Sequence, residues 1–125
     1  MNILALNIGS SSFKAKIFDF KTLKEIKTFK IDDISYQGVA KVFKQINPSD
    51  IGFVVHRVVH GGEKYSKATL IDSNVKKDIK NLISLAPIHN KINLQGILEA
   101  EKYFPNAKQI AVFDTAFHHN LSQLA

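Results

Sequence analysis

The chain has 125 residues, 45% of them apolar and 22% charged, which is the size and composition of one soluble globular domain. It contains no cysteine, so disulfide frameworks, thiolate metal sites and cysteine nucleophiles are excluded. No apolar run approaches the roughly 18 residues that a membrane span needs, and the N-terminus lacks the basic region of a signal peptide, so we expect a cytoplasmic protein.

The net charge is +6, from 17 basic and 11 acidic residues. Such a balance suits nucleic acid, an acidic membrane surface or a small anionic ligand. The lysines are scattered along the chain, however, and Arg57 is the only arginine, whereas dedicated DNA-binding proteins use several arginines. We therefore expect a lysine-coated surface, with neither a nucleic acid nor a membrane as partner.

Residues 2–8 and 12–20 predict a β-hairpin, because apolar and polar side chains alternate along these segments. Asn7 ends the otherwise apolar row of the first segment. In the second segment the period of two separates a polar face from an apolar face, made respectively of Ser12, Lys14 and Lys16 and of Phe13, Ala15 and Ile17.

The rest of the chain predicts an edge strand, a helix, a strand, two helices and a last strand, in this order. The expected ranges are 24–31 for the edge strand, Ser35 to about Ile46 for the first helix, 51–59 for the next strand, Asp72 or Ser73 to before Pro87 for the second helix, about Asn93 to before Pro105 for the third helix, and 108–114 for the last strand. The order βββαβα(α)β predicts an α/β domain with a mixed β-sheet flanked by helices.

The segment from Asn7 to Lys14 joins the two hairpin strands through one glycine and three serines. Backbone amides and hydroxyls in such a turn can hold phosphate oxygens, Lys14 adds positive charge, and the Asn7 amide can orient a metal-bound water or a phosphoryl group. The spacing is neither GxxxxGK[ST] nor GxGxxG, and a polar hairpin turn needs no ligand. The segment alone leaves both interpretations open.

Arg57 lies within the apolar, strand-like run IGFVVHRVV and is followed by HGGE. A guanidinium in such a run needs an anionic partner, either a buried carboxylate of the chain or a bound phosphate or carboxylate ligand. His56 and His60 are four residues apart, but on a strand this spacing favours hydrogen-bonding core histidines over zinc ligands.

Two further polar segments follow. LAPIHNKIN offers His89 and Asn93 after the turn at Pro87, although helix capping alone explains Asn93. VFDTAFHH places Asp114 at the carboxyl end of the last strand. A carboxylate there can hold magnesium or act on a substrate proton, and it can equally cap the next helix.

A serine-rich turn with a lysine, one arginine and one strand-end aspartate are together typical of phosphoryl transfer, which depends on positioning and charge neutralisation. In this order, the strings NIGSSSFK, HRVVHGGE, APIHN and VFDTAFH closely resemble the amino-terminal half of the acetate kinase (acetokinase) family, over about residues 2–121. The resemblance implies the ribonuclease H-like fold of one domain of the actin, sugar kinase and heat-shock ATPase superfamily.

The resemblance also implies reversible, Mg²⁺-dependent transfer of the γ-phosphoryl group of ATP to acetate, giving acetyl phosphate and ADP, by an enzyme that is a homodimer at full length. Carried over by position, it assigns Asp114 and Arg57 to catalysis, Arg57, Val59 and His89 to substrate binding, Ser10, Ser12 and Lys14 to phosphate or ATP binding, and Asn7 to the metal.

The chain departs from the family in three places. Lys91 replaces the proline that usually follows His-Asn, the stretch between the second strand and Arg57 is shorter, and the carboxyl-terminal, nucleotide-binding domain has no counterpart. We therefore expect residues 1–125 to form one amino-terminal domain that is inactive alone. A non-catalytic domain that binds phosphate or acyl phosphate is the alternative, and a propionate kinase-type variant is another.

Overall fold

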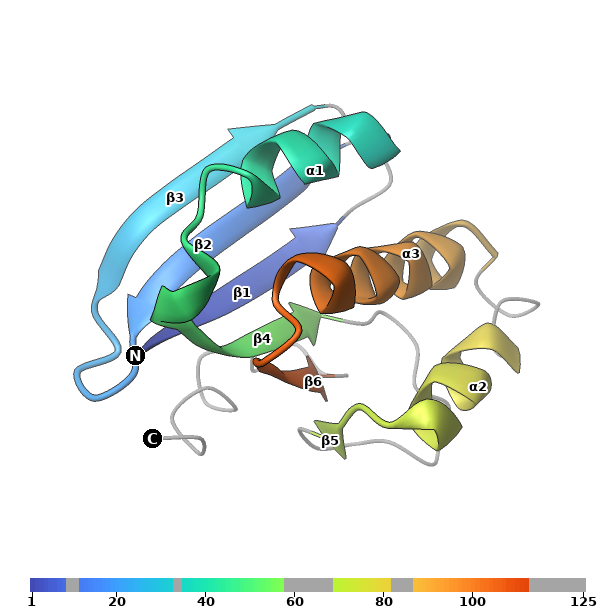
Figure 1. Ribbon diagram of the computed structural model, residues 1–125. Helices are drawn as coiled ribbons and strands as arrows, with labels where there is room; N and C mark the ends of the chain where they lie inside the picture. Colours follow the sequence, from blue (N-terminus) through green and yellow to red (C-terminus); the bar gives the residue numbers. More distant parts are fainter. Residues whose placement is uncertain (9–11, 33–34, 58–68, 82–86, 113–125) are drawn as a thin grey trace.

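The computed structural model describes residues 1–8, 12–32, 35–57, 69–81 and 87–112, with Tyr36 and residues 87–91 described by their backbone alone. Within these ranges the chain forms one six-stranded sheet and three α-helices (Figure 1). The strands are β1 (Asn2–Ile8), β2 (Phe13–Asp19), β3 (Glu25–Ile31), β4 (Ile51–Arg57), β5 (Thr69–Leu70) and β6 (Lys108–Val112). The helices are α1 (Tyr36–Phe43), α2 (Ser73–Asn81) and α3 (Pro87–Tyr103), with a 3₁₀ turn at Pro48–Asp50.

The sheet is mixed, with the strand order β3-β2-β1-β4-β6-β5. The first three strands form an antiparallel meander, whereas β1, β4 and β6 run parallel to one another. The short β5 pairs antiparallel with β6. The predicted hairpin, the edge position of the third strand and the mixed α/β sheet are therefore confirmed.

The main core lies between one face of the sheet and the helices α1 and α3, while α2 packs against α3 (Figure 1). Phe43 of α1 is at its centre. Its ring makes edge-to-face contacts with Phe13 of β2 and with Tyr103 and Phe104 at the end of α3, at centroid distances of 6.1, 5.8 and 5.3 Å. These contacts tie the hairpin to both helices.

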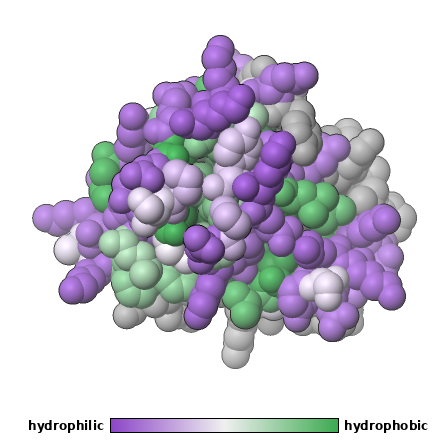
Figure 2. All heavy atoms as spheres, in the orientation of Figure 1, coloured by the Kyte–Doolittle hydropathy of each residue, from purple (hydrophilic) through white to green (hydrophobic). Residues whose placement is uncertain are grey.

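The opposite face of the sheet holds a second, smaller apolar cluster, made of Ile3, Ala5, Phe18, Val55, Ile110 and Val112. The surface in Figure 2 is mostly hydrophilic, and lysines such as Lys27, Lys41 and Lys80 are exposed, as their scatter along the sequence predicts. No helix in the described ranges is long and apolar enough to cross a membrane.

Polar caps begin the two shorter helices, as predicted. The side chains of Ser35 and Asp72 each accept a hydrogen bond from the backbone N–H three residues further on, at 3.3 and 2.9 Å. The predicted end of the first helix at Ile46 is three residues too late. The N–H of Lys44 still bonds four residues back, to Ala40, but those of Gln45 and Ile46 bond to carbonyls three residues back, which is a 3₁₀-type turn.

The prediction that the third helix begins near Asn93 is wrong, because α3 begins at Pro87. Proline suits the first turn of a helix, where its missing N–H would have no partner within the helix. Asn93 therefore lies inside α3, where it is buried and caps nothing. Further along α3, a methyl group added to Gly96 would lie 2.7 Å from Cδ1 of Ile8, so this glycine lets α3 approach β1 closely. The two-residue strand β5 was not predicted, since it is too short to show a period.

A buried polar pair links β4 to β6 on the helix side of the sheet. His56 is 3% exposed, and its Nε2–H donates to Oε1 of Gln109 at 2.6 Å. Burial lowers the pKa of His56 to about 4, while the hydrogen bond to Gln109 opposes this shift. The prediction of a hydrogen-bonding core histidine is thus confirmed for His56, while His60 lies outside the described residues.

The low pKa of His56 predicts acid sensitivity. His56 takes up a proton near the ordinary pKa of 6.5 in the unfolded chain and only near 4 in the folded chain. The stability that comes from keeping His56 neutral is therefore complete above pH 6.5 and is lost as the pH falls toward 4. Between pH 7 and 5 we expect the free energy of unfolding to fall by about 2 kcal/mol more in the unsubstituted chain than in His56→Gln. Urea unfolding at both pH values measures this difference, and equal losses in the two chains would refute it.

Glu99 of α3 is a buried carboxylate at the groove between α1 and α3. It is 2% exposed, and neither carboxylate oxygen has a hydrogen-bond partner among the residues that the structure describes. Lys41, Lys44 and Lys102 line the same groove, but none of them hydrogen-bonds to it. A buried polar group without a hydrogen-bond partner destabilises the folded state.

Replacing Glu99 by an apolar side chain of similar length should therefore stabilise the fold. We expect Glu99→Met to raise the free energy of unfolding by about 1–3 kcal/mol. The matched control is Glu101→Met, two residues further along α3, which loses a partly exposed ion pair with Lys76 at 3.2 Å and should lower stability by at most about 1 kcal/mol. Denaturant titration distinguishes them, and a destabilised Glu99→Met would indicate that a lysine of the groove pairs with Glu99 in solution.

Candidate functional site

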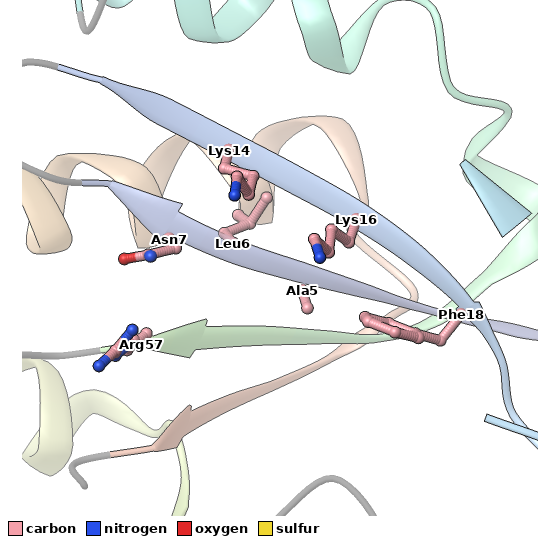
Figure 3. Close-up of a pocket in the computed structure, with 7 residues that line it drawn as sticks. All are labelled: Ala5, Leu6, Asn7, Lys14, Lys16, Phe18 and Arg57. Atoms are coloured by element: carbon pink, nitrogen blue, oxygen red, sulfur yellow. The ribbon is translucent and has the colours of Figure 1, made fainter. Parts of the chain in front are cut away.

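A cavity of about 150 Å³ opens on the sheet face that turns away from α1 and α3, where β1 and β4 end (Figure 3). Its polar lining is Asn7, Lys14, Lys16 and Arg57, and its apolar lining is Ala5, Leu6 and Phe18. Among the residues that the structure describes, the lining thus contains three cations, one amide and no carboxylate. Such a cavity favours an anionic ligand.

The strand register explains why these polar side chains meet. Asn7 of β1 and Lys14 of β2 are direct partners across the hairpin. The parallel pairing of β1 with β4 matches Leu6 with His56. Asn7 follows Leu6 on β1 and Arg57 follows His56 on β4, so Asn7 and Arg57 lie side by side. Lys14, Asn7 and Arg57 therefore form a row across three neighbouring strands at the carboxyl ends of the parallel pair, where α/β sheets commonly bind ligands.

Arg57 is the last residue of β4 and is half-buried rather than embedded. Its guanidinium makes no ion pair or hydrogen bond with another residue in the described ranges. Of the two alternatives for Arg57, a buried carboxylate partner is not found among these residues. The planar group with its several N–H donors remains available to a carboxylate or a phosphate.

The two lysines of the cavity differ in their surroundings. Lys14 has no charged partner within the described part of the chain, whereas Nζ of Lys16 is 3.0 Å from Oε1 of Glu25 on β3. Sequence reasoning did not assign Lys16 to the site. The signal was present, because the period of two already placed it on the same face as Lys14.

The structure brings together three of the predicted site residues, Asn7, Lys14 and Arg57. Ser12 is half-buried just before β2 and is not part of the cavity lining. His89 belongs to the first turn of α3 and is described by its backbone alone. Three further predicted site residues lie outside the described residues, namely Ser10, Val59 and Asp114.

Nothing in the described ranges forms a protein-only metal site, since no three His, Cys, Asp or Glu side chains gather there. Asn7, the predicted metal contact, presents one exposed amide at the cavity. Mg²⁺ commonly takes only one or two protein ligands and completes its shell with phosphate oxygens and water. The amide oxygen of Asn7 fits such a minor role.

Several known proteins are similar to this chain in sequence. The model of the acetokinase family matches residues 29–125. An acetate kinase of Symbiobacterium thermophilum is 36% identical over 158 positions, and one of Clostridium botulinum (strain Eklund 17B / Type B) is 33% identical over 159 positions, each including the whole chain. Each match covers 40% of the relative, so the chain spans about two fifths of the length of these relatives.

Solved structures share the fold. A propionate kinase from Francisella tularensis superposes with a TM-score of 0.76 at 33% identity, covering 94% of this chain and 38% of that one. The acetate kinase of Porphyromonas gingivalis gives 0.77 at 28% identity, covering 93% and 38%. The fold implied by the resemblance, that of one domain of the actin and sugar kinase superfamily, is confirmed. Because the family model covers most of the chain and the curated acetate kinases align with all of it, the chain belongs to the acetokinase family.

Proposed function

We propose that this chain is the amino-terminal, acceptor-binding part of an acetate kinase, which transfers the γ-phosphoryl group of ATP to acetate and gives acetyl phosphate and ADP. The observation that supports this function is the row of Lys14, Asn7 and Arg57 at a cavity whose described lining is positively charged. Both substrates of the reaction are anions, and a cavity of this charge lowers the cost of bringing them together.

The chemistry asks for positioning and charge neutralisation. An oxygen of the acetate carboxylate attacks the γ-phosphorus, the bond from that phosphorus to the bridging oxygen breaks, and ADP leaves with the electron pair. Negative charge spreads over the oxygens of the moving group. Arg57 can bind the acetate carboxylate or the moving group through two parallel N–H bonds, and Lys14 adds a point charge from the neighbouring side.

Mg²⁺, when bound, neutralises part of the phosphate charge, and Asn7 is the described residue that would contact it. The remaining roles come from the position of residues within the family motifs. Asp114 is proposed as the essential acidic residue, Ser10 and Ser12 as phosphate contacts, and Val59 and His89 as parts of the acceptor pocket.

We further propose that residues 1–125 act as one domain and that a second, nucleotide-binding domain completes the cleft. The share of the relatives that the chain covers, about two fifths, supports this division. Phosphoryl-transfer enzymes that bind their substrates in a cleft between two domains depend on closure of the domains around both substrates. The isolated chain is accordingly expected to bind anions but not to turn over.

Propionate is a second candidate acceptor, favoured by the match to the Francisella propionate kinase. A small apolar pocket discriminates one methylene group only modestly, by about 10- to 200-fold. The two acids therefore differ in degree and not in mechanism.

Arg57 should be required for transfer. In the chain combined with the carboxyl-terminal domain of the Clostridium botulinum relative, Arg57→Gln is expected to lower ATP formation from acetyl phosphate and ADP by at least about 100-fold, because it removes a charged donor at the moving group. The charge-matched control is Lys80→Gln, on the exposed side of α2, which should keep full activity. Full activity in Arg57→Gln would contradict the proposed function.

An activity assay with and without the second domain tests the division into domains, and the Asp114→Ala variant tests the role of Asp114. We expect no ATP formation by the 125-residue chain alone, activity once the carboxyl-terminal domain is supplied, and a loss of at least about 100-fold on Asp114→Ala. Asp50→Ala, at an exposed 3₁₀ turn, is the matched control. Turnover by the isolated chain would show that the second domain is dispensable, and an active Asp114→Ala would remove this residue from the chemistry.

A further inference from the structure

Lys16 lines the cavity but has no role in the reaction described above. It follows Lys14 by two residues on β2, and both side chains extend from the same face of the sheet (Figure 3). Two residues of strand separate their Cα atoms by about 7 Å. The cavity therefore has cations at two positions along β2, with Lys14 beside Asn7 and Lys16 beside Ala5.

The partner of Lys16 lies outside the cavity lining. Glu25 is on the edge strand β3, and the side chains of the pair are 32% and 47% exposed. An ion pair this open to water contributes little stability and is readily exchanged. An anion in the cavity can therefore compete with Glu25 for the ammonium group of Lys16.

Glu25 stays charged at neutral pH. Its side-chain hydrogen bonds, first to Lys16 and then to Thr28, lower the pKa of its carboxyl group below the ordinary value. The Glu25 carboxylate thus remains negatively charged at neutral pH, and it acts on anion binding in the cavity by pairing with Lys16.

Acetate and a phosphoryl group differ in the number of cations that they need. One carboxylate is matched by a single guanidinium, as Arg57 provides. Among the residues that the structure describes, the lining has three cations, and this positive charge suits a group that has two or more negative charges. Lys16, the cation furthest from the strand ends, is surplus for a carboxylate and useful for such a group.

We propose that Lys16 is a specificity-determining residue that selects a doubly charged phosphoryl group over a carboxylate, and that Glu25 limits this selection by competing for the same ammonium. When a phosphoryl group binds, Lys16 exchanges Glu25 for a phosphate oxygen. The inference rests on the proposed function of the cavity and adds to it a residue and a charge preference.

A purely structural pair would behave differently. Lys16 faces Thr28 across the β2–β3 pairing and Glu25 faces Phe18, so the ion pair runs diagonally between the two strands. If it only held β3 to the sheet, removing either partner would lower stability and leave anion affinity unchanged. The two interpretations therefore differ in the effect of Glu25 on binding.

The test measures binding of inorganic phosphate and of acetate to the 125-residue chain by calorimetric titration, at a pH where phosphate is a dianion. Lys16→Gln should weaken phosphate binding by about 3- to 10-fold and leave acetate binding nearly unchanged. Glu25→Gln should strengthen phosphate binding by about 2- to 5-fold, and the double variant should behave like Lys16→Gln. Lys27→Gln is the charge-matched control, since Lys27 lies on β3 and is not part of the cavity lining.

Arg57→Gln distinguishes this inference from the proposed function. Phosphate binding that depends on Arg57 but not on Lys16, or that Glu25→Gln weakens, would overturn the role of Lys16 and leave the proposed function intact. Phosphate binding that is absent, or that depends on none of these residues, would overturn both.

Discussion

The parallel pairing of β1 with β4 is the constraint on which the cavity depends. Its register matches Leu6 with His56 on the helix side, and the residues one step further along, Asn7 and Arg57, face the other side. Because side chains alternate along a strand, a slip of one residue would turn Arg57 toward the core and His56 away from it. Burial of Val54 and His56 on the helix side, where His56 also bonds to Gln109 of β6, keeps Arg57 on the other face of the sheet.

The same alternation lets β2 stabilise the fold and build the cavity at once. Phe13 and Ala15 are fully buried against the helices, while Lys14 and Lys16, which alternate with them along β2, face the cavity on the other side of the sheet. Gathering like charges on one face opposes folding, since they repel one another. Burial of the apolar residues on the reverse of the strand offsets this repulsion, so the binding face depends on the core behind it.

Features set by neighbouring residues could be predicted from the sequence, and features set by other strands could not. The hairpin and the caps at Ser35 and Asp72 follow from local patterns, and they are where the structure has them. The start of α3 was wrong because Pro87 is compatible both with the end of a turn and with the first turn of a helix. The sequence around Lys16 contains no binding motif, and its partner Glu25 becomes visible only once β2 and β3 are paired.

The cavity is therefore a property of three strands rather than of any motif. Local motifs single out Asn7, Lys14 and Arg57, but their proximity comes from the register of β2, β1 and β4. All three strands belong to the core that packs on α1 and α3, so the row is complete within this chain. In-line transfer additionally needs a nucleotide aligned with the acceptor. Under the proposed function, anion affinity and turnover are thus separate properties, and the first can be tested in this chain without the second.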